Sequence, residues 1–114
     1  MSERSRAARK VREVYAPPDT RIPRRLGCGV LKEYVVRELP SRRVIQYALA
    51  YVNPLICSED NGRVLGYDNA HGRPHRHFMG KMTTESFPGY EALWERFERE
   101  WQEIALQFVR EGMR

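Results

Sequence analysis

Two stretches near the middle of the chain alternate between apolar and polar positions in the manner of β-strands. Residues 30–39, VLKEYVVREL, are rich in β-branched and aromatic side chains, and residues 43–53, RVIQYALAYVN, alternate cleanly. The second stretch places four apolar side chains on one face: Ile45, Tyr47, Leu49 and Tyr51. Pro40, Ser41 and Arg42 lie between the two stretches and are typical of a turn, so the pattern predicts a β-hairpin.

A third strand is expected after Asn61 and Gly62, because both residues accept the positive φ of a tight type I′ turn. This strand spans residues 63–69, RVLGYDN, and residues 54–60 lengthen the loop before it. A short turn that contains glycine and proline then leads to a fourth expected strand over residues 75–82.

The last part of the chain shows the three- and four-residue spacing of an amphipathic helix. Its apolar stripe consists of Tyr90, Leu93, Trp94, Phe97, Trp101, Ile104 and Phe108. Such a stripe more often packs against a sheet than stacks on nucleic-acid bases, so we expect it to form the core. The predicted fold class is therefore α+β, an antiparallel β-meander of about four strands packed against a long C-terminal helix.

The first 25 residues differ from the rest because they are rich in arginine and proline. Their basic side chains are Arg4, Arg6, Arg9, Lys10 and Arg12. A short amphipathic helical stripe is expected from Ala7, Ala8, Val11, Val14 and Tyr15. Pro17, Pro18 and Pro23 prevent this helix from continuing. We therefore divide the chain into a basic N-terminal arm, residues 1–25, and a single α+β domain, residues 26–114. The arm binds phosphates or a partner protein, or is flexible in isolation.

Charge is spread unevenly over the 114 residues, whose formal net charge is +5. Residues 1–29 carry +5, residues 30–82 carry +3 and residues 83–114 carry −3. The positive charge of the N-terminal part of the chain favours a polyanionic partner, with nucleic acid as the first candidate. An ordinary charged protein surface is the plainer alternative.

The sequence also bears on where the protein works. No apolar run approaches the ~20 residues that a membrane span requires, and no apolar stretch follows the N-terminal arginines as in a secretory signal. Cys28 and Cys57 are widely separated and lack the spacing of metal ligands, which favours reduced thiols. We therefore expect a cytoplasmic protein that does not contact a membrane.

All three histidines lie within residues 66–77, GYDNAHGRPHRH. The internal glycine and proline exclude a helix here, so the last three residues are expected to be extended. Their period of two places the imidazoles of His75 and His77 on one face and Arg76 on the other, while His71 projects from the preceding turn.

Three hypotheses fit this cluster. A metal site would take ligands from Asp68, His71, His75 and His77, although no HExxH or CxxC pattern accompanies them. RNA cleavage needs a base for the 2′-hydroxyl proton, an acid for the leaving 5′-oxygen and a cation for the phosphorane. Two histidines together with Arg73, Arg76 or Lys81 supply these roles. The third hypothesis is a polar hairpin whose histidines bond only to the backbone.

The segment RVLGYDNAHGRPHRHFMG lies between a tyrosine-rich strand and a helix that begins near FPGYEALWERF, and it resembles the TumE family of small prokaryotic toxins. The resemblance covers roughly residues 30–110; the arginine-rich N-terminus and the PLICSED segment, residues 54–60, lie outside its pattern. The motif residues are Tyr67, Asp68, Asn69, His71, Gly72, His75, Arg76 and His77. The resemblance implies a ribonucleolytic toxin of a type II toxin–antitoxin system, encoded beside an antitoxin that carries a helix-turn-helix domain.

We therefore predict a toxin that cleaves RNA by acid–base chemistry without a metal or other cofactor. The predicted catalytic residues are Asp68, His71, Arg73, His75, Arg76 and His77. The predicted substrate-binding residues are Arg63, Tyr67, Asn69 and Lys81. His75 and His77 are the expected proton-transfer pair, with Asp68 orienting one imidazole. The alternatives are a non-catalytic nucleic-acid-binding module and a metal-dependent nuclease built on histidine and aspartate.

Overall fold

Two ten-residue strands, β3 (Val30–Leu39) and β4 (Arg43–Val52), form the central hairpin of the computed structural model, which describes residues 11–113. A three-residue turn joins the two strands at the predicted position. Alternate side chains of β4 are buried, as the sequence pattern predicts: Tyr47, Leu49 and Tyr51. The hairpin therefore presents one strongly apolar face to the core.

Three further strands continue the antiparallel sheet beyond β4: β5 (Arg63–Asp68), β6 (His75–Phe78) and β7 (Lys81–Thr84). The expected fourth strand is thus two short strands. The turn between them is made by Met79 and Gly80, whose φ angles are 52° and 84°. Positive φ at both positions is the geometry of a type I′ hairpin turn. Methionine gave no sign of this turn in the sequence, because it rarely adopts a positive φ.

The loop before β5 agrees with the prediction. Asn61 and Gly62 have φ angles of 55° and 84° and end a short 3₁₀ turn, η2 (Asp60–Gly62). Residues 54–60 lie in the loop between β4 and η2 or in the start of that turn, as expected.

The N-terminal part of the chain differs from the prediction. Two strands, β1 (Val11–Tyr15) and β2 (Thr20–Arg21), pair antiparallel with β3, so the sheet has seven strands rather than four. The helical stripe expected for Val11, Val14 and Tyr15 is wrong, because these residues are extended. Within residues 11–21, β1 and β2 therefore belong to the sheet. The rest of the expected arm lies outside the described residues: the basic side chains Arg4, Arg6, Arg9 and Lys10, and Ala7 and Ala8 of the stripe.

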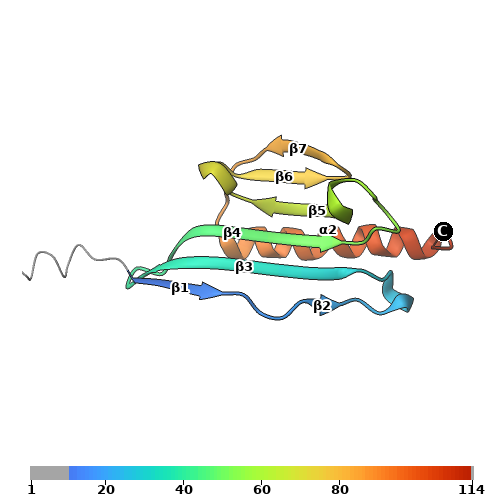
Figure 1. Ribbon diagram of the computed structural model, residues 1–114, viewed down its shortest axis with the longest axis horizontal. Helices are drawn as coiled ribbons and strands as arrows, with labels where there is room; N and C mark the ends of the chain where they lie inside the picture. Colours follow the sequence, from blue (N-terminus) through green and yellow to red (C-terminus); the bar gives the residue numbers. More distant parts are fainter. Residues whose placement is uncertain (1–10, 114) are drawn as a thin grey trace, which may run out of the picture.

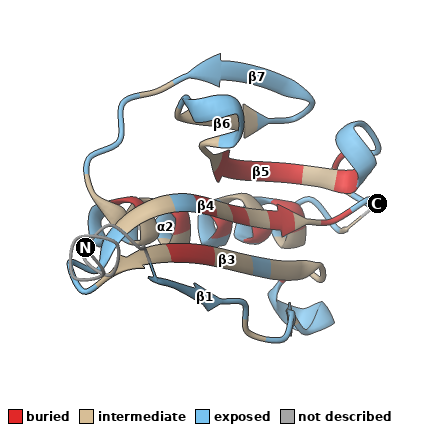
Figure 2. Ribbon diagram, turned by 60° about the vertical axis from the view of Figure 1, so that its left-hand side comes forward, coloured by how far each residue is buried: buried red, intermediate tan, exposed pale blue. Residues whose placement is uncertain are grey.

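The helix α2 (Tyr90–Arg110) covers one face of the sheet, which confirms the predicted α+β architecture (Figure 1). Its buried side chains follow the helical period: Leu93, Phe97, Trp101, Ala105 and Phe108. The Trp101 ring packs against Tyr51 with a centroid distance of 5.6 Å, so the tryptophan belongs to the core, as predicted. Figure 2 shows burial concentrated on the central strands and the adjoining face of α2, whereas β1 and β7 at the two edges are exposed. Among the described helices, none has the length and apolar character needed to cross a membrane.

The packing of the core predicts that two substitutions on α2 differ strongly in their effect on the free energy of unfolding. Phe97 is fully buried, so Phe97→Ala should lower the free energy of unfolding by about 3–5 kcal/mol, because it leaves a cavity between helix and sheet. Leu106 is 49% exposed, and Leu106→Ala should change stability by no more than about 0.5 kcal/mol. Urea denaturation of both variants measures the contrast. Equal effects would contradict the packing described for α2.

Candidate functional site

The two faces of β5 and β6 have different chemistry. Tyr67 lies directly opposite Arg76, and both side chains hydrogen-bond to Glu100 of α2, so both face the helix. Neighbouring residues along a strand point to opposite faces. Asp68, His75 and His77 therefore lie on the face away from α2, which we call the open face. In Figure 1 α2 lies behind β4, so the open face is turned toward the viewer.

On the open face a carboxylate lies between two imidazoles. Asp68 Oδ2 is 2.8 Å from Nε2 of His77, and Oδ1 is 3.8 Å from Nδ1 of His75. The two rings have a centroid distance of 6.4 Å and an interplanar angle of 71°. The three side chains are only 13–14% exposed. The shared face predicted for the two histidines is confirmed, and so is the contact of Asp68 with one imidazole.

Arg63 determines which ring nitrogen of His77 carries the proton. Its Nη2 lies 3.0 Å from His77 Nδ1, and its Nε donates to Asp60 at 2.7 Å. A guanidinium can only donate hydrogen bonds, so Nδ1 of His77 must be the acceptor. The proton of the neutral ring then lies on Nε2 and is donated to Asp68. Both nitrogens of His77 are therefore engaged.

His75 differs from its neighbour in this respect. Its Nδ1 faces Asp68 at a distance longer than a hydrogen bond, and its Nε2 has no hydrogen-bond partner within residues 11–113. Distances of this kind often shorten when a substrate binds. Of the two imidazoles, His75 is the one with a nitrogen available for proton transfer.

A glycine makes room for Arg63. Gly66 lies opposite His77, and a Cβ atom at Gly66 would be 2.7 Å from Cδ of Arg63 and 3.3 Å from the carbonyl oxygen of Leu49. The arginine side chain therefore crosses the sheet over the space that this glycine leaves. A glycine inside a strand often marks such a close approach, which is the sequence signal that would have identified this contact.

The turn between β5 and β6 holds the other predicted residues of the motif. It contains a short 3₁₀ turn, η3 (Ala70–Gly72), in which His71 has a φ of 64°. The side chains of His71 and Arg73 are exposed and have no hydrogen bond or ion pair to any residue that the structure describes. Asn69, predicted to bind substrate, instead accepts from the Tyr47 backbone N–H at 3.0 Å and donates to the Ile45 carbonyl at 3.1 Å. Its amide fixes the turn to β4.

Three predicted residues lie on the helix-facing side rather than with the histidines. Tyr67 is 2% exposed; its hydroxyl donates to Glu100 at 2.5 Å and accepts from Nε of Arg76 at 3.0 Å. Lys81 lies opposite Phe78, whose ring is 5.1 Å from the Arg76 guanidinium carbon, so it shares that face. The period of two along β5 and β6 separates Tyr67, Arg76 and Lys81 from the open face. Sequence reasoning missed Glu100, because α2 brings it to β5 only in the folded chain.

The contacts around Glu100 shift the pKa of this carboxyl group and that of Tyr67. Burial by itself raises the pKa of a carboxyl group, but the hydrogen bond from Tyr67 and the charges of Arg76 and Arg96 outweigh it. The pKa of Glu100 is therefore lower than the ordinary value. Burial, and next the hydrogen bond to this carboxylate, raise the pKa of Tyr67 to about 12. Glu100 is thus a charged anchor between α2 and the β5–β6 hairpin.

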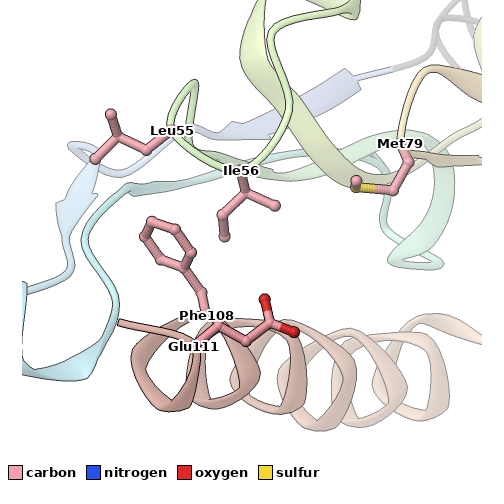
Figure 3. A pocket seen from close by; sticks show the side chains of 5 residues that line it. All are labelled: Leu55, Ile56, Met79, Phe108 and Glu111. Carbon is pink, nitrogen blue, oxygen red and sulfur yellow. The ribbon is translucent and has the colours of Figure 1, made fainter. Parts of the chain in front are cut away.

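No metal-binding geometry is found within residues 11–113: no three His, Cys, Asp or Glu side chains are arranged to hold an ion. A separate hollow of about 510 Å³ lies between the loop after β4, the β6–β7 turn and the end of α2 (Figure 3). Its lining residues are Leu55, Ile56, Met79, Phe108 and Glu111. None of the predicted site residues lines this hollow.

Gly66→Ala tests the arrangement around Arg63. The new methyl group should displace Arg63, remove its hydrogen bond to His77 and lower the free energy of unfolding by about 1 kcal/mol. Nitrogen chemical shifts of the His77 ring should show that Nε2 no longer carries the proton exclusively. In an Arg63→Ala background, Gly66→Ala should add little, because the two changes remove the same contact. Fully additive effects would contradict this account.

Glu100 predicts a pH dependence of stability. Its pKa is lower in the folded chain than in the unfolded chain, so the ionised carboxylate stabilises the fold above the unfolded value of 4.5. This contribution is lost as the pH falls through the folded pKa. When the pH is lowered from about 6 to about 3, the free energy of unfolding should therefore fall less for Glu100→Gln than for the wild type. Glu103→Gln, at an exposed position of the same helix, should behave like the wild type in denaturant titrations at both pH values.

Comparisons with models of known protein families, with curated proteins and with solved structures find no match for this chain.

Proposed function

We propose that this protein is a toxin that cleaves single-stranded RNA at the open face, with His75 as the general base. The observation that carries the proposal is the largely buried Asp68 between two imidazoles, of which only His75 has a nitrogen without a partner among residues 11–113. A carboxylate beside one ring nitrogen holds the proton there and leaves the other nitrogen as a base. His77 is a positioning residue that satisfies the remaining oxygen of Asp68.

The chemistry follows from these roles. Nε2 of neutral His75 takes the proton of a ribose 2′-hydroxyl while the 2′-oxygen forms a bond to phosphorus. The bond from phosphorus to the 5′-oxygen breaks, and the leaving oxygen takes a proton from the imidazolium form of His71 in the adjoining turn. The products are a 2′,3′-cyclic phosphate and a 5′-hydroxyl. Asp68 stabilises the imidazolium that forms at His75.

The negative charge of the phosphorane needs a cation nearby. Arg73 projects from the same turn as His71, and its guanidinium has no partner within the described part of the chain. Arg63 already lies beside His77 and Asp68. The sequence suggested Arg73, Arg76 or Lys81 for the cationic role. We assign it to Arg73 and Arg63, because Arg76 and Lys81 lie on the helix-facing side.

The biological setting of the proposal comes from the resemblance to TumE toxins. It calls for an adjacent gene whose helix-turn-helix antitoxin neutralises this protein, and for RNA in the cytoplasm as the substrate. The net charge of +5 fits a polyanionic substrate.

Glutamine substitutions separate the two histidines. An amide supplies an acceptor oxygen and a donor nitrogen, so His77→Gln can keep the bonds to Arg63 and Asp68, but it cannot exchange protons near neutral pH. We expect His77→Gln to retain most of the RNA cleavage. His75→Gln should lower the rate by about 100- to 10,000-fold and abolish growth arrest on expression. Cleavage of an unstructured RNA and growth after induction measure both effects.

Thr83→Ala, on the exposed edge strand β7, is the control and should leave cleavage unchanged. Full activity of His75→Gln would overturn the proposed role. Cleavage that is lost with a chelator and restored by zinc or manganese would favour the metal-dependent alternative. RNA binding without any cleavage by the wild type would favour the non-catalytic binding module.

A further inference from the structure

A tyrosine lies in the same cross-strand row as Asp68 and His75. Tyr34 on β3 is opposite Ala48 on β4, Ala48 is opposite Asp68, and Asp68 is opposite His75. Directly opposite residues of antiparallel strands share a face. The Tyr34 side chain therefore belongs to the open face, three strands away from His75. At the usual strand spacing this separation is about 14 Å.

Tyr34 differs from the other tyrosines of the chain. Four of them hydrogen-bond or stack within the core or against α2: Tyr47, Tyr51, Tyr67 and Tyr90. Tyr15 is 56% exposed but lies opposite the buried Val35, on the helix-facing side. Tyr34 is half-buried, and neither its ring nor its hydroxyl has a partner within residues 11–113. No described helix covers its face of the sheet.

The residues around Tyr34 leave its ring accessible and add positive charge. Ala48 and Ala50 are the adjoining open-face residues of β4, so only methyl groups separate Tyr34 from the next strand. Lys32, two residues before Tyr34, is half exposed and pairs with Asp19 at 2.6 Å. Arg21 extends the same face beside β3, and its guanidinium has no partner within the described chain. It lines an open hollow of about 700 Å³ at that end of the sheet.

We propose that Tyr34 is a stacking position for a nucleobase of single-stranded RNA that crosses the open face toward His75. A flat aromatic ring on a helix-free sheet face offers stacking to any unpaired base, and bases in a duplex are not available for it. Lys32 and Arg21 contact phosphates on the same path. This proposal rests on the proposed function and adds a subsite remote from the scissile phosphate, because about 14 Å separate Tyr34 from His75.

Binding of an RNA that cannot be cleaved tests the subsite independently of catalysis. A fluorescent single-stranded oligonucleotide with 2′-O-methyl groups lacks the attacking hydroxyl, and its affinity for the full chain is measured by anisotropy. Tyr34→Ala should raise Kd about 5- to 150-fold, the loss expected for one stacked base. Tyr34→Phe keeps the ring and should bind like the wild type. Tyr15→Ala removes an exposed tyrosine from the other face and should have no effect.

Two further measurements sharpen the result. Lys32→Ala should reduce the salt dependence of log Kd by about one unit of slope, as for one lost phosphate contact. Thermal unfolding of Tyr34→Ala should match the wild type, because Tyr34 is not part of the core cluster.

The outcomes for the subsite and for catalysis are distinguishable. Unchanged affinity of Tyr34→Ala, equal loss in Tyr15→Ala, or no binding of the oligonucleotide by the wild type overturns the subsite. Stacking at Tyr34 in a protein that cleaves no RNA supports the subsite and rejects the catalytic proposal.

Discussion

The hydrogen bonds that join Tyr67 and Arg76 to Glu100 determine which way β5 and β6 face. They attach this hairpin to α2 through a carboxylate that stays ionised, and they assign every second residue of both strands to the helix side. The intervening residues, Asp68 and the two histidines, are thereby directed to the open face. The chemistry of one face thus depends on the packing of the other.

A largely buried carboxylate is stable only when its oxygens have partners. Asp68 meets this requirement with His77, with the backbone N–H of Ala70 at 3.1 Å, and with the charge of Arg63 at 3.6 Å. Arg63 also contacts Asp60 and His77, so one guanidinium links the loop before β5 to the imidazole on β6. This linkage explains why both nitrogens of His77 are bound, whereas His75 retains a nitrogen that has no partner in the described part of the chain.

The open face combines features that favour an extended polyanion. Small residues on β4 leave the neighbouring backbone and the Tyr34 ring accessible. Tyr34 and Lys32 lie on β3, and His75 and His77 lie on β6. The helix side, in contrast, contains the large apolar rings and the paired charges that stabilise the fold. The proposed activity therefore draws on the open face, and the packing of the core on the helix side.

Local patterns in the sequence determined the sheet, the helix and the faces of individual residues. The alternation in residues 30–53 predicted the central strands, and the three- and four-residue spacing predicted α2. Each pattern was sufficient because it reflects the geometry of a single element. The same reasoning correctly placed His75 and His77 together and Arg76 opposite them.

Contacts between distant segments were decided only by the tertiary structure. β1 became a strand because β3 offered an unpaired edge, whereas its sequence alone also fitted a short helix. Arg63 reached His77, 14 residues away, because Gly66 left space between them, and Glu100 met Tyr67 across 33 residues. The sequence contains the residues for these contacts, but their partners depend on how whole elements pack, which no local periodicity encodes.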